Sequence, residues 1–66
     1  MNYSKALRVS MIKRGLTQID LAKKSGLTVT TLSKISNGKV IPSTRTLHFI
    51  LKALKVTYHE FEVLGE

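Results

Sequence analysis

The stretch TQIDLAKKSGLTVTTLSKISNG (residues 17–38) holds two short amphipathic segments separated by one glycine. Thr17 can accept a hydrogen bond from the free amides of a first helical turn, and Asp20 stands at the third helical position, as in a capping box. Gly26 adopts a positive φ without steric cost, which a sharp turn between helices requires. The stretch therefore predicts two helices joined by a tight turn, the first of which begins at Gln18.

The second segment repeats this arrangement with Thr28 as its cap. Its helix should run from about residue 29 to residue 36 and stop at Asn37-Gly38, because both residues tolerate the left-handed conformation that ends helices. Only Leu32 and Ile35 are needed on the inner face, and the other positions carry mostly short or flexible side chains. Because β-branched residues disfavour an isolated helix, the core behind this helix must hold it in place.

The flanking segments also show the apolar spacing of helices rather than of strands. A first helix is expected over residues 3–14 and should end at Gly15. A fourth helix follows Pro42 and is capped by Ser43 or Thr44. These segments place two further helices around the central pair.

A short fifth helix should begin with a capping box formed by Thr57 and Glu60. Together the helices supply enough core positions for a compact domain of marginal stability: Leu7, Met11, Leu16, Leu21, Ala22, Leu32, Ile35, Leu47, Ile50, Leu51, Leu54, Val56 and Phe61. We therefore expect one all-α domain of five helices over residues 1–66.

The net charge of the chain indicates which kinds of partner it attracts. The 66 residues carry 11 Lys and Arg against 4 Asp and Glu, for a net charge of +7, while Glu60, Glu62 and Glu66 gather at the end. A positive field of this size favours a polyanion, either nucleic acid or an anionic membrane surface, although such an excess also serves solubility alone. No stretch approaches the roughly 20 apolar residues of a membrane span. A membrane-surface helix would need bulky apolar anchors, but a packed core uses Tyr3, Leu7 and Met11, so we expect no membrane partner.

The residue types that carry catalysis and metal binding are sparse. The chain has no cysteine, and its two histidines, His48 and His59, lie far apart, so we expect neither a metal site nor a cofactor. There is no glycine-rich phosphate loop, and no nucleophile is paired with a base. We therefore expect a cytoplasmic protein that is not an enzyme.

Three segments, TQIDLAKKSG, TLSKISNG and PSTRTLHFILKALKV, resemble the Cro/lambda-repressor-like helix-turn-helix family, also called the xenobiotic-response-element type of regulator. The resemblance covers nearly the whole chain and is most specific between residues 18 and 37. There the family pattern has apolar residues at the positions of Leu21, Leu32 and Ile35. It has a small residue at the position of Ala22 and a glycine at that of Gly26. The resemblance implies a helix-turn-helix over residues 17–38 within the five-helix fold.

The chain departs from the family pattern at two places. Many members pair an arginine in the first helix with a glutamate late in the third, and Met11 and Ser36 stand at those positions. A thioether is flexible enough to fill the first site by packing. Lys55 replaces the usual glycine after the fourth helix, so it must either take a strained conformation or end the helix differently.

The resemblance implies that the third helix enters the major groove of DNA, which admits an α-helix and displays a distinct pattern for each base pair. The residues expected to contact bases are Val29, Thr30, Ser33 and Lys34. Lys34 would donate to guanine, and Val29 and the Thr30 methyl would meet a thymine methyl. For Ser33, an ordinary solvated helix position is an equally good interpretation.

Phosphate contacts position such a protein without reading sequence. The resemblance and the position of Gln18 at a helix N-terminus imply phosphate contacts by Thr17, Gln18, Asn37, Gly38, Lys39 and Arg45. The alternative for Thr17 is that it acts only as a cap. Surface solvation is the better interpretation of four other basic residues, Lys5, Arg8, Lys23 and Lys24.

Members of the family usually bind as symmetric dimers on half-sites about one helical turn apart. The interface expected here lies after the fourth helix, at Val56, Tyr58, His59 and Phe61. For Val56 and Phe61 the alternative is that they close the core.

These observations predict a dimeric, sequence-specific regulator of transcription that binds double-stranded operator DNA as a repressor. It would act in the nucleoid of a bacterial or phage-infected cell. The alternative is an antitoxin or controller-type protein-interaction module of the same fold, which binds a protein partner and regulates its own operon.

Overall fold

The computed structural model describes residues 2–66 and contains five helices over them. The helices are α1 (Tyr3–Arg14), α2 (Gln18–Ser25), α3 (Val29–Ser36), α4 (Thr44–Leu54) and α5 (Tyr58–Leu64). No strand occurs in this part of the chain. The predicted all-α fold is confirmed, and the bounds expected for the first three helices are those observed.

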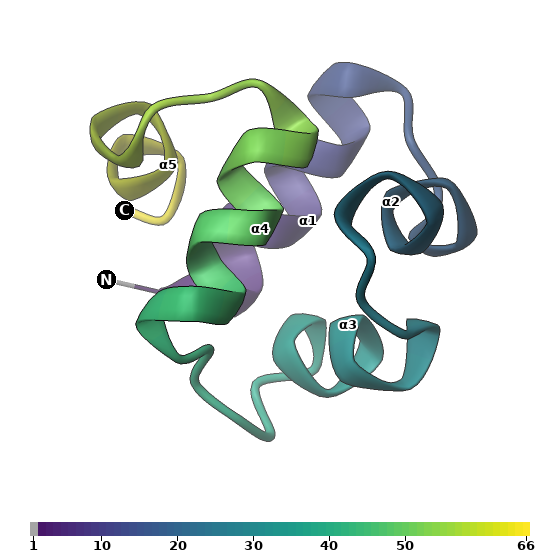
Figure 1. The fold of residues 1–66 in the computed structure, drawn as a ribbon. Coiled ribbons are helices and arrows are strands. Elements are labelled where there is room, and N and C mark those ends of the chain that lie inside the picture. Colours follow the sequence, from purple (N-terminus) through teal and green to yellow (C-terminus); the bar gives the residue numbers. More distant parts are fainter. Residues whose placement is uncertain (1) are drawn as a thin grey trace.

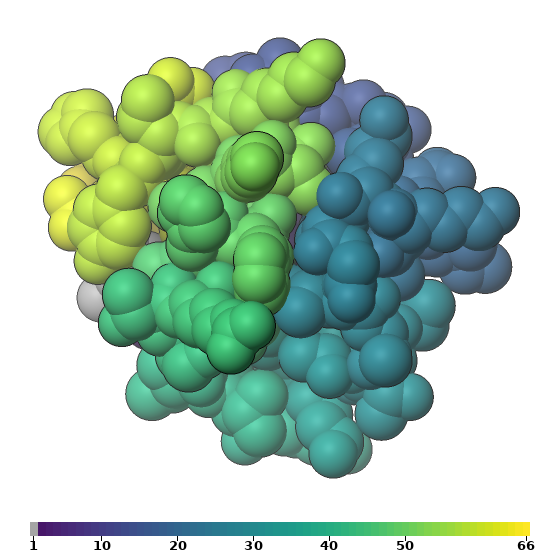
Figure 2. Space-filling model, viewed as in Figure 1, coloured from purple at the N-terminus to yellow at the C-terminus, as the bar shows by residue number. Residues whose placement is uncertain are grey.

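The helices surround α4, which crosses the middle of the molecule in front of α1 (Figure 1). α1 packs against α3 and α5, while α2 packs against α3 and α4. In the space-filling view, α3 forms the lower edge of the molecule and α5 the opposite upper corner (Figure 2). The helix expected to read DNA and the end expected to pair with a second copy are therefore on different sides.

Side-chain caps begin every helix. The Thr17 hydroxyl accepts from the backbone N–H of Asp20, and the Asp20 carboxylate accepts from the backbone N–H of Thr17, so the predicted capping box is complete. Thr28 caps α3 as expected, and Ser43 rather than Thr44 caps α4. Asn2, which the sequence analysis did not single out, caps α1.

Two of the predicted helix caps, the one at the start of α5 and the one at the end of α3, are only partly correct. At α5, Thr57 accepts from the backbone N–H of Glu60, but the structure shows no reciprocal bond from the Glu60 carboxylate. After α3, Asn37 has a φ of −93° and lies in a turn outside the left-handed region, so the left-handed residue is Gly38 alone, with a φ of 73°.

Lys55 ends α4 in the left-handed conformation, with a φ of 58°, and is the one non-glycine residue with positive φ among those described. Of the two outcomes left open, the strained one is found. The Arg14 guanidinium donates to the Lys55 carbonyl oxygen at 3.0 Å, which ties this turn to the end of α1.

The predicted core is confirmed. Leu16, Ala22, Leu51 and Val56 are partly buried and pack against the other predicted positions, which are buried. The structure adds Ala6 to this cluster, and Met11 is only 7% exposed, so it fills by packing the site where relatives carry an arginine.

Candidate nucleic-acid interface

One side of α3 faces outward. Val29, Thr30 and Lys34 are exposed and Ser33 is partly buried, while Leu32 and Ile35 are buried. The helical period places the first four side chains on one face and the two apolar ones on the other. The structure therefore brings the four residues expected to contact bases together on one narrow surface.

The N-terminus of α2 lies beside this surface because α2 and α3 pack against each other. The hydrogen bond from the backbone N–H of Thr17 to the Asp20 carboxylate, followed by the effect of the Thr17 side chain, lowers the pKa of that carboxyl group. Thr17 thus has the capping role given as the alternative, and its contact with phosphate stays a prediction. Gln18 is only partly exposed, which the sequence did not indicate.

The Gln18 side chain is turned toward α3. Its Nε2 atom donates to Ser36 Oγ at 3.1 Å, and Ser36 Oγ donates in turn to the Ser33 carbonyl oxygen at 3.1 Å. Ser36 is 7% exposed, at the position where many relatives carry a glutamate. The sequence shows that the ion pair is missing, but it does not reveal the hydrogen bond between Gln18 and Ser36 near that place.

The turn after α3 is fixed to that helix. The backbone N–H of Gly38 donates to Ile35 and that of Lys39 donates to Lys34, at 3.0 and 2.9 Å. The Asn37 side-chain amide donates to Ser33 Oγ at 3.3 Å. Three residues expected to contact phosphate are thus exposed and held at the end of α3.

Arg45 lies in the first turn of α4, and its guanidinium carbon is 5.7 Å from the centre of the Phe49 ring. A cation over an aromatic face at this distance is attracted by the ring. Because Arg45 is exposed, the ring orders its charged group without burying it. This is a suitable state for a residue expected to contact phosphate.

The residues expected at a dimer interface divide into two groups. Tyr58 and His59 are exposed, whereas Phe61 is completely buried and Val56 packs against the core. Phe61 closes the core, as the alternative held, and has no exposed surface in the single chain. Its contact with a second copy stays a prediction.

Exposed apolar surface that the sequence analysis missed lies before α4. Ile41 is 77% exposed and follows Val40, which is 42% exposed. The next residue, Pro42, lines a groove of about 300 Å³ together with Tyr3, Thr44, Leu47, His48, Leu51 and Tyr58. The Tyr3 phenol beside Tyr58 raises the pKa of the Tyr58 hydroxyl.

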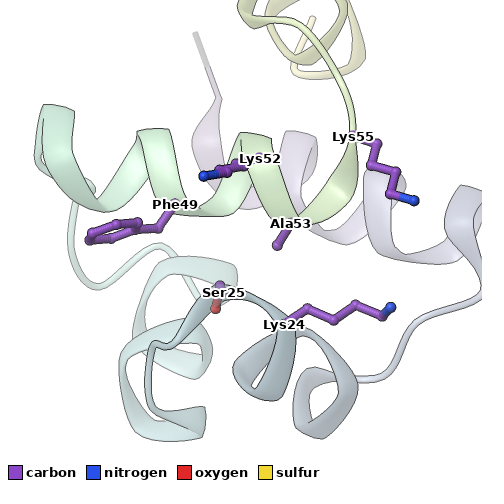
Figure 3. A pocket seen from close by; sticks show the side chains of 6 residues that line it. All are labelled: Lys24, Ser25, Phe49, Lys52, Ala53 and Lys55. Atoms are coloured by element: carbon purple, nitrogen blue, oxygen red, sulfur yellow. The ribbon is translucent and has the colours of Figure 1, made fainter.

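A basic groove of about 390 Å³ lies between α2 and α4 (Figure 3). It is lined by Lys24, Ser25, Phe49, Lys52, Ala53 and Lys55, and none of the residues expected to contact bases is among them. Its three lysines add to the positive field that attracts a polyanion. Lys24, interpreted from the sequence as solvated surface, therefore lines a groove with two other lysines.

Neither a metal site nor a membrane-spanning helix is found among residues 2–66. No group of three or more His, Asp and Glu side chains there could hold a metal ion. In the same range, none of the helices combines the length and the apolar composition needed to cross a membrane.

Comparisons with known proteins agree with this arrangement. A family model described as helix-turn-helix matches residues 5–61. The wild-type restriction-modification controller protein C.Esp1396I superposes with a TM-score of 0.86 at 30% identity, over 96% of this chain and 81% of that one. A tyrosine-to-alanine variant of that controller protein gives a TM-score of 0.85 at 33% identity, over 96% and 83% of the two chains. A search of curated proteins gave no match.

The family model spans most of the chain, and the five helices superpose on those of a solved member. The chain therefore belongs to the Cro/lambda-repressor type of helix-turn-helix family and is a DNA-binding transcriptional regulator.

Proposed function

We propose that the protein is a dimeric repressor that binds a specific double-stranded DNA operator and reads it with α3. The observation that carries this proposal is the outer face of α3, where Val29, Thr30, Ser33 and Lys34 lie together. Three of these side chains are short, so the helix can approach the base edges closely. The opposite face is locked into the core.

Lys34 is the residue with the widest reach on this face. Its ammonium group would donate to guanine O6 and N7, whereas Val29 and the Thr30 methyl would pack against a thymine methyl. Ser33 is hydrogen-bonded by Asn37. Its base contact would therefore compete with a bond inside the protein.

The phosphate contacts surround α3 on two sides. Gln18 with the first turn of α2 lies on one side, and Asn37, Gly38 and Lys39 follow the end of α3. Arg45 would add a clamp from α4. If about five phosphates are neutralised per subunit, log Kd should rise with log salt concentration at a slope of about 4 to 5 per bound subunit, and about twice that for the dimer.

The second copy is proposed to bind at Tyr58 and His59, with Val56 behind them. Tyr58 and Pro42 line the same groove, and Ile41, which precedes Pro42, is largely exposed. This exposed apolar surface supports a protein partner on this side of the molecule. Two copies would place two α3 helices on half-sites about one helical turn apart. The acidic residues of α5 would keep this end away from phosphate.

A controller-type regulator that acts on its own operon is the second candidate. The superposition on the restriction-modification controller protein C.Esp1396I favours it. In this case the protein would bind a promoter next to its own gene, and a protein partner could modulate that binding. Either function places the protein in the cytoplasm of a bacterial or phage-infected cell.

The experiment that tests the proposal is selection of binding sites from a pool of random duplexes, followed by fluorescence anisotropy on the selected duplex. We expect two inverted half-sites whose centres are about 10 base pairs apart. Lys34→Ala should weaken binding and relax the preference at one base pair. Lys39→Ala should weaken selected and random duplexes alike and lower the salt slope by about one.

Two results would contradict this proposal. The pool might yield no enriched sequence, in which case the protein is not a specific reader. Alternatively, both variants might lose the same affinity on selected and random duplexes, which would remove Lys34 from the base contacts.

A further inference from the structure

Ser36 joins three helices at one residue. It is the last residue of α3, and its carbonyl oxygen accepts a hydrogen bond from Ser4 Oγ on α1. Its hydroxyl accepts from Gln18 Nε2 on α2 and donates to the Ser33 carbonyl oxygen within α3. With an exposed fraction of 7%, it makes these contacts almost out of contact with water.

The direction of these bonds fixes the Gln18 side chain. A serine hydroxyl has one proton, and Ser36 gives that proton to the Ser33 carbonyl. Only lone pairs of the oxygen then face Gln18, so the glutamine must present its amide nitrogen and not its oxygen. That nitrogen carries two hydrogens, and Ser36 takes one of them.

The position of Gln18 at the start of α2 makes this orientation of its amide suited to donate to an anion. Gln18 is the first residue of α2. The capping box takes the backbone N–H groups of Thr17 and Asp20, whereas those of Gln18 and Ile19 have no carbonyl partner inside the helix and attract anions. A second side-chain N–H held beside those groups adds a donor for the same phosphate oxygen. The structure thus shows this side chain already ordered before any DNA is bound.

We propose that Ser36 is a positioning residue, which holds the amide of Gln18 ready for a DNA phosphate and ties that contact to the base-reading helix. The inference rests on the proposed function, because it assigns Ser36 a role in the same DNA site. Ordering a long side chain before binding removes part of the entropy cost of association, which corresponds to about three- to tenfold in Kd.

Ser10 offers a matched control. It is the other buried serine among the described residues, with an exposed fraction of 1%. Its hydroxyl donates to the Ala6 carbonyl oxygen at 2.6 Å, within α1. Ser10→Ala and Ser36→Ala therefore remove the same atom from comparable burial, but only the second removes a contact between α2 and α3.

The test is a double-mutant cycle on the selected duplex, measured by anisotropy at one salt concentration. We expect Ser36→Ala to raise Kd about three- to tenfold and Ser10→Ala to leave it unchanged. Gln18→Ala should raise Kd at least as much as Ser36→Ala. In the Gln18→Ala background, Ser36→Ala should have no further effect, because the group that it positions is gone.

Two outcomes of the cycle would overturn the inference. Ser36→Ala might leave Kd unchanged, or its effect might multiply fully with that of Gln18→Ala, as expected of a purely structural residue. Both results presuppose that the wild-type protein binds the selected duplex specifically. Absence of specific binding by the wild type would instead refute the proposed function.

A measurement on the wild-type protein covers the case in which Ser36→Ala does not fold. The two protons on Gln18 Nε2 should give separate NMR signals, one of them shifted as a hydrogen-bonded proton, and both should move on addition of the selected duplex. Signals at the positions of a solvated glutamine, unmoved by the duplex, would overturn the inference without any variant.

Discussion

The turn between α2 and α3 and the turn between α4 and α5 have the same design but different residues. Each has a left-handed residue after one helix and a threonine cap before the next. The first turn uses Gly26, with a φ of 78°, and the second uses Lys55, with a φ of 58°. Glycine takes this conformation freely, whereas it costs other residues about 1–2 kcal/mol.

The difference shows which parts of the fold are set locally. Helices α2 and α3 each begin with a threonine cap and are joined by the residue best suited to the turn. At the other turn the conformation is unfavourable, so tertiary contacts must maintain it. These are the hydrogen bond from Arg14 to Lys55 and the burial of Phe61.

The largest effect is expected from removing the side chain that anchors α5. Phe61→Ala should lower the free energy of unfolding by about 3–5 kcal/mol, because it empties a fully buried aromatic site. Urea denaturation followed by circular dichroism would measure this loss. Tyr58→Ala, on the same helix but half exposed, is the control and should cost far less. Equal losses would mean that Phe61 does not anchor α5.

The next effect tests the local half of the comparison. Gly26→Ala should destabilise the protein by about 1–2 kcal/mol, because alanine is strained at this positive φ. A Cβ atom there would meet no neighbour within 4 Å, so no clash contributes. Thermal denaturation should show a lower midpoint. Gly26→Asn should lose less, since asparagine tolerates the left-handed region, and an equal loss for both variants would point to a cause other than backbone strain.

Lys55→Gly should change the free energy of unfolding in the opposite direction to Gly26→Ala, and by less. Relief of the strained φ stabilises the folded state, while the greater freedom of glycine when unfolded offsets part of this gain. We expect a net increase of up to about 1 kcal/mol in the free energy of unfolding. Lys55→Ala removes the same charge but keeps the strain, so it should give no such increase. A gain shared by both variants would assign the effect to charge.

Local signals explain how much of this fold the sequence reveals. Caps such as Thr17, Thr28 and Ser43 act within one helical turn, so they can be read without knowing the fold. The bond between Gln18 and Ser36 joins residues 18 positions apart, and no local pattern announces it. The burial of Phe61 likewise depends on which face α5 turns to the core.

The smallest effect concerns pH and the capping box of α2. The hydrogen bonds from Thr17 lower the pKa of Asp20 in the folded protein. A carboxyl group with a depressed folded pKa adds stability above its unfolded pKa of about 4, and this contribution is lost as the pH falls through the folded value. Urea denaturation midpoints measured at acid and neutral pH should therefore fall less steeply toward acid in Asp20→Asn than in the wild type.

Glu60 makes this prediction a comparison between the two turns. It occupies the same position in α5 as Asp20 does in α2, but the structure shows only the bond from its backbone N–H to Thr57. Asp20→Asn should therefore lower the urea midpoint at neutral pH more than Glu60→Gln does, because only the first substitution disturbs a reciprocal bond. If the two substitutions lower the midpoint equally, the capping box at α2 adds no stability of its own, and the local difference between the turns reduces to glycine against lysine.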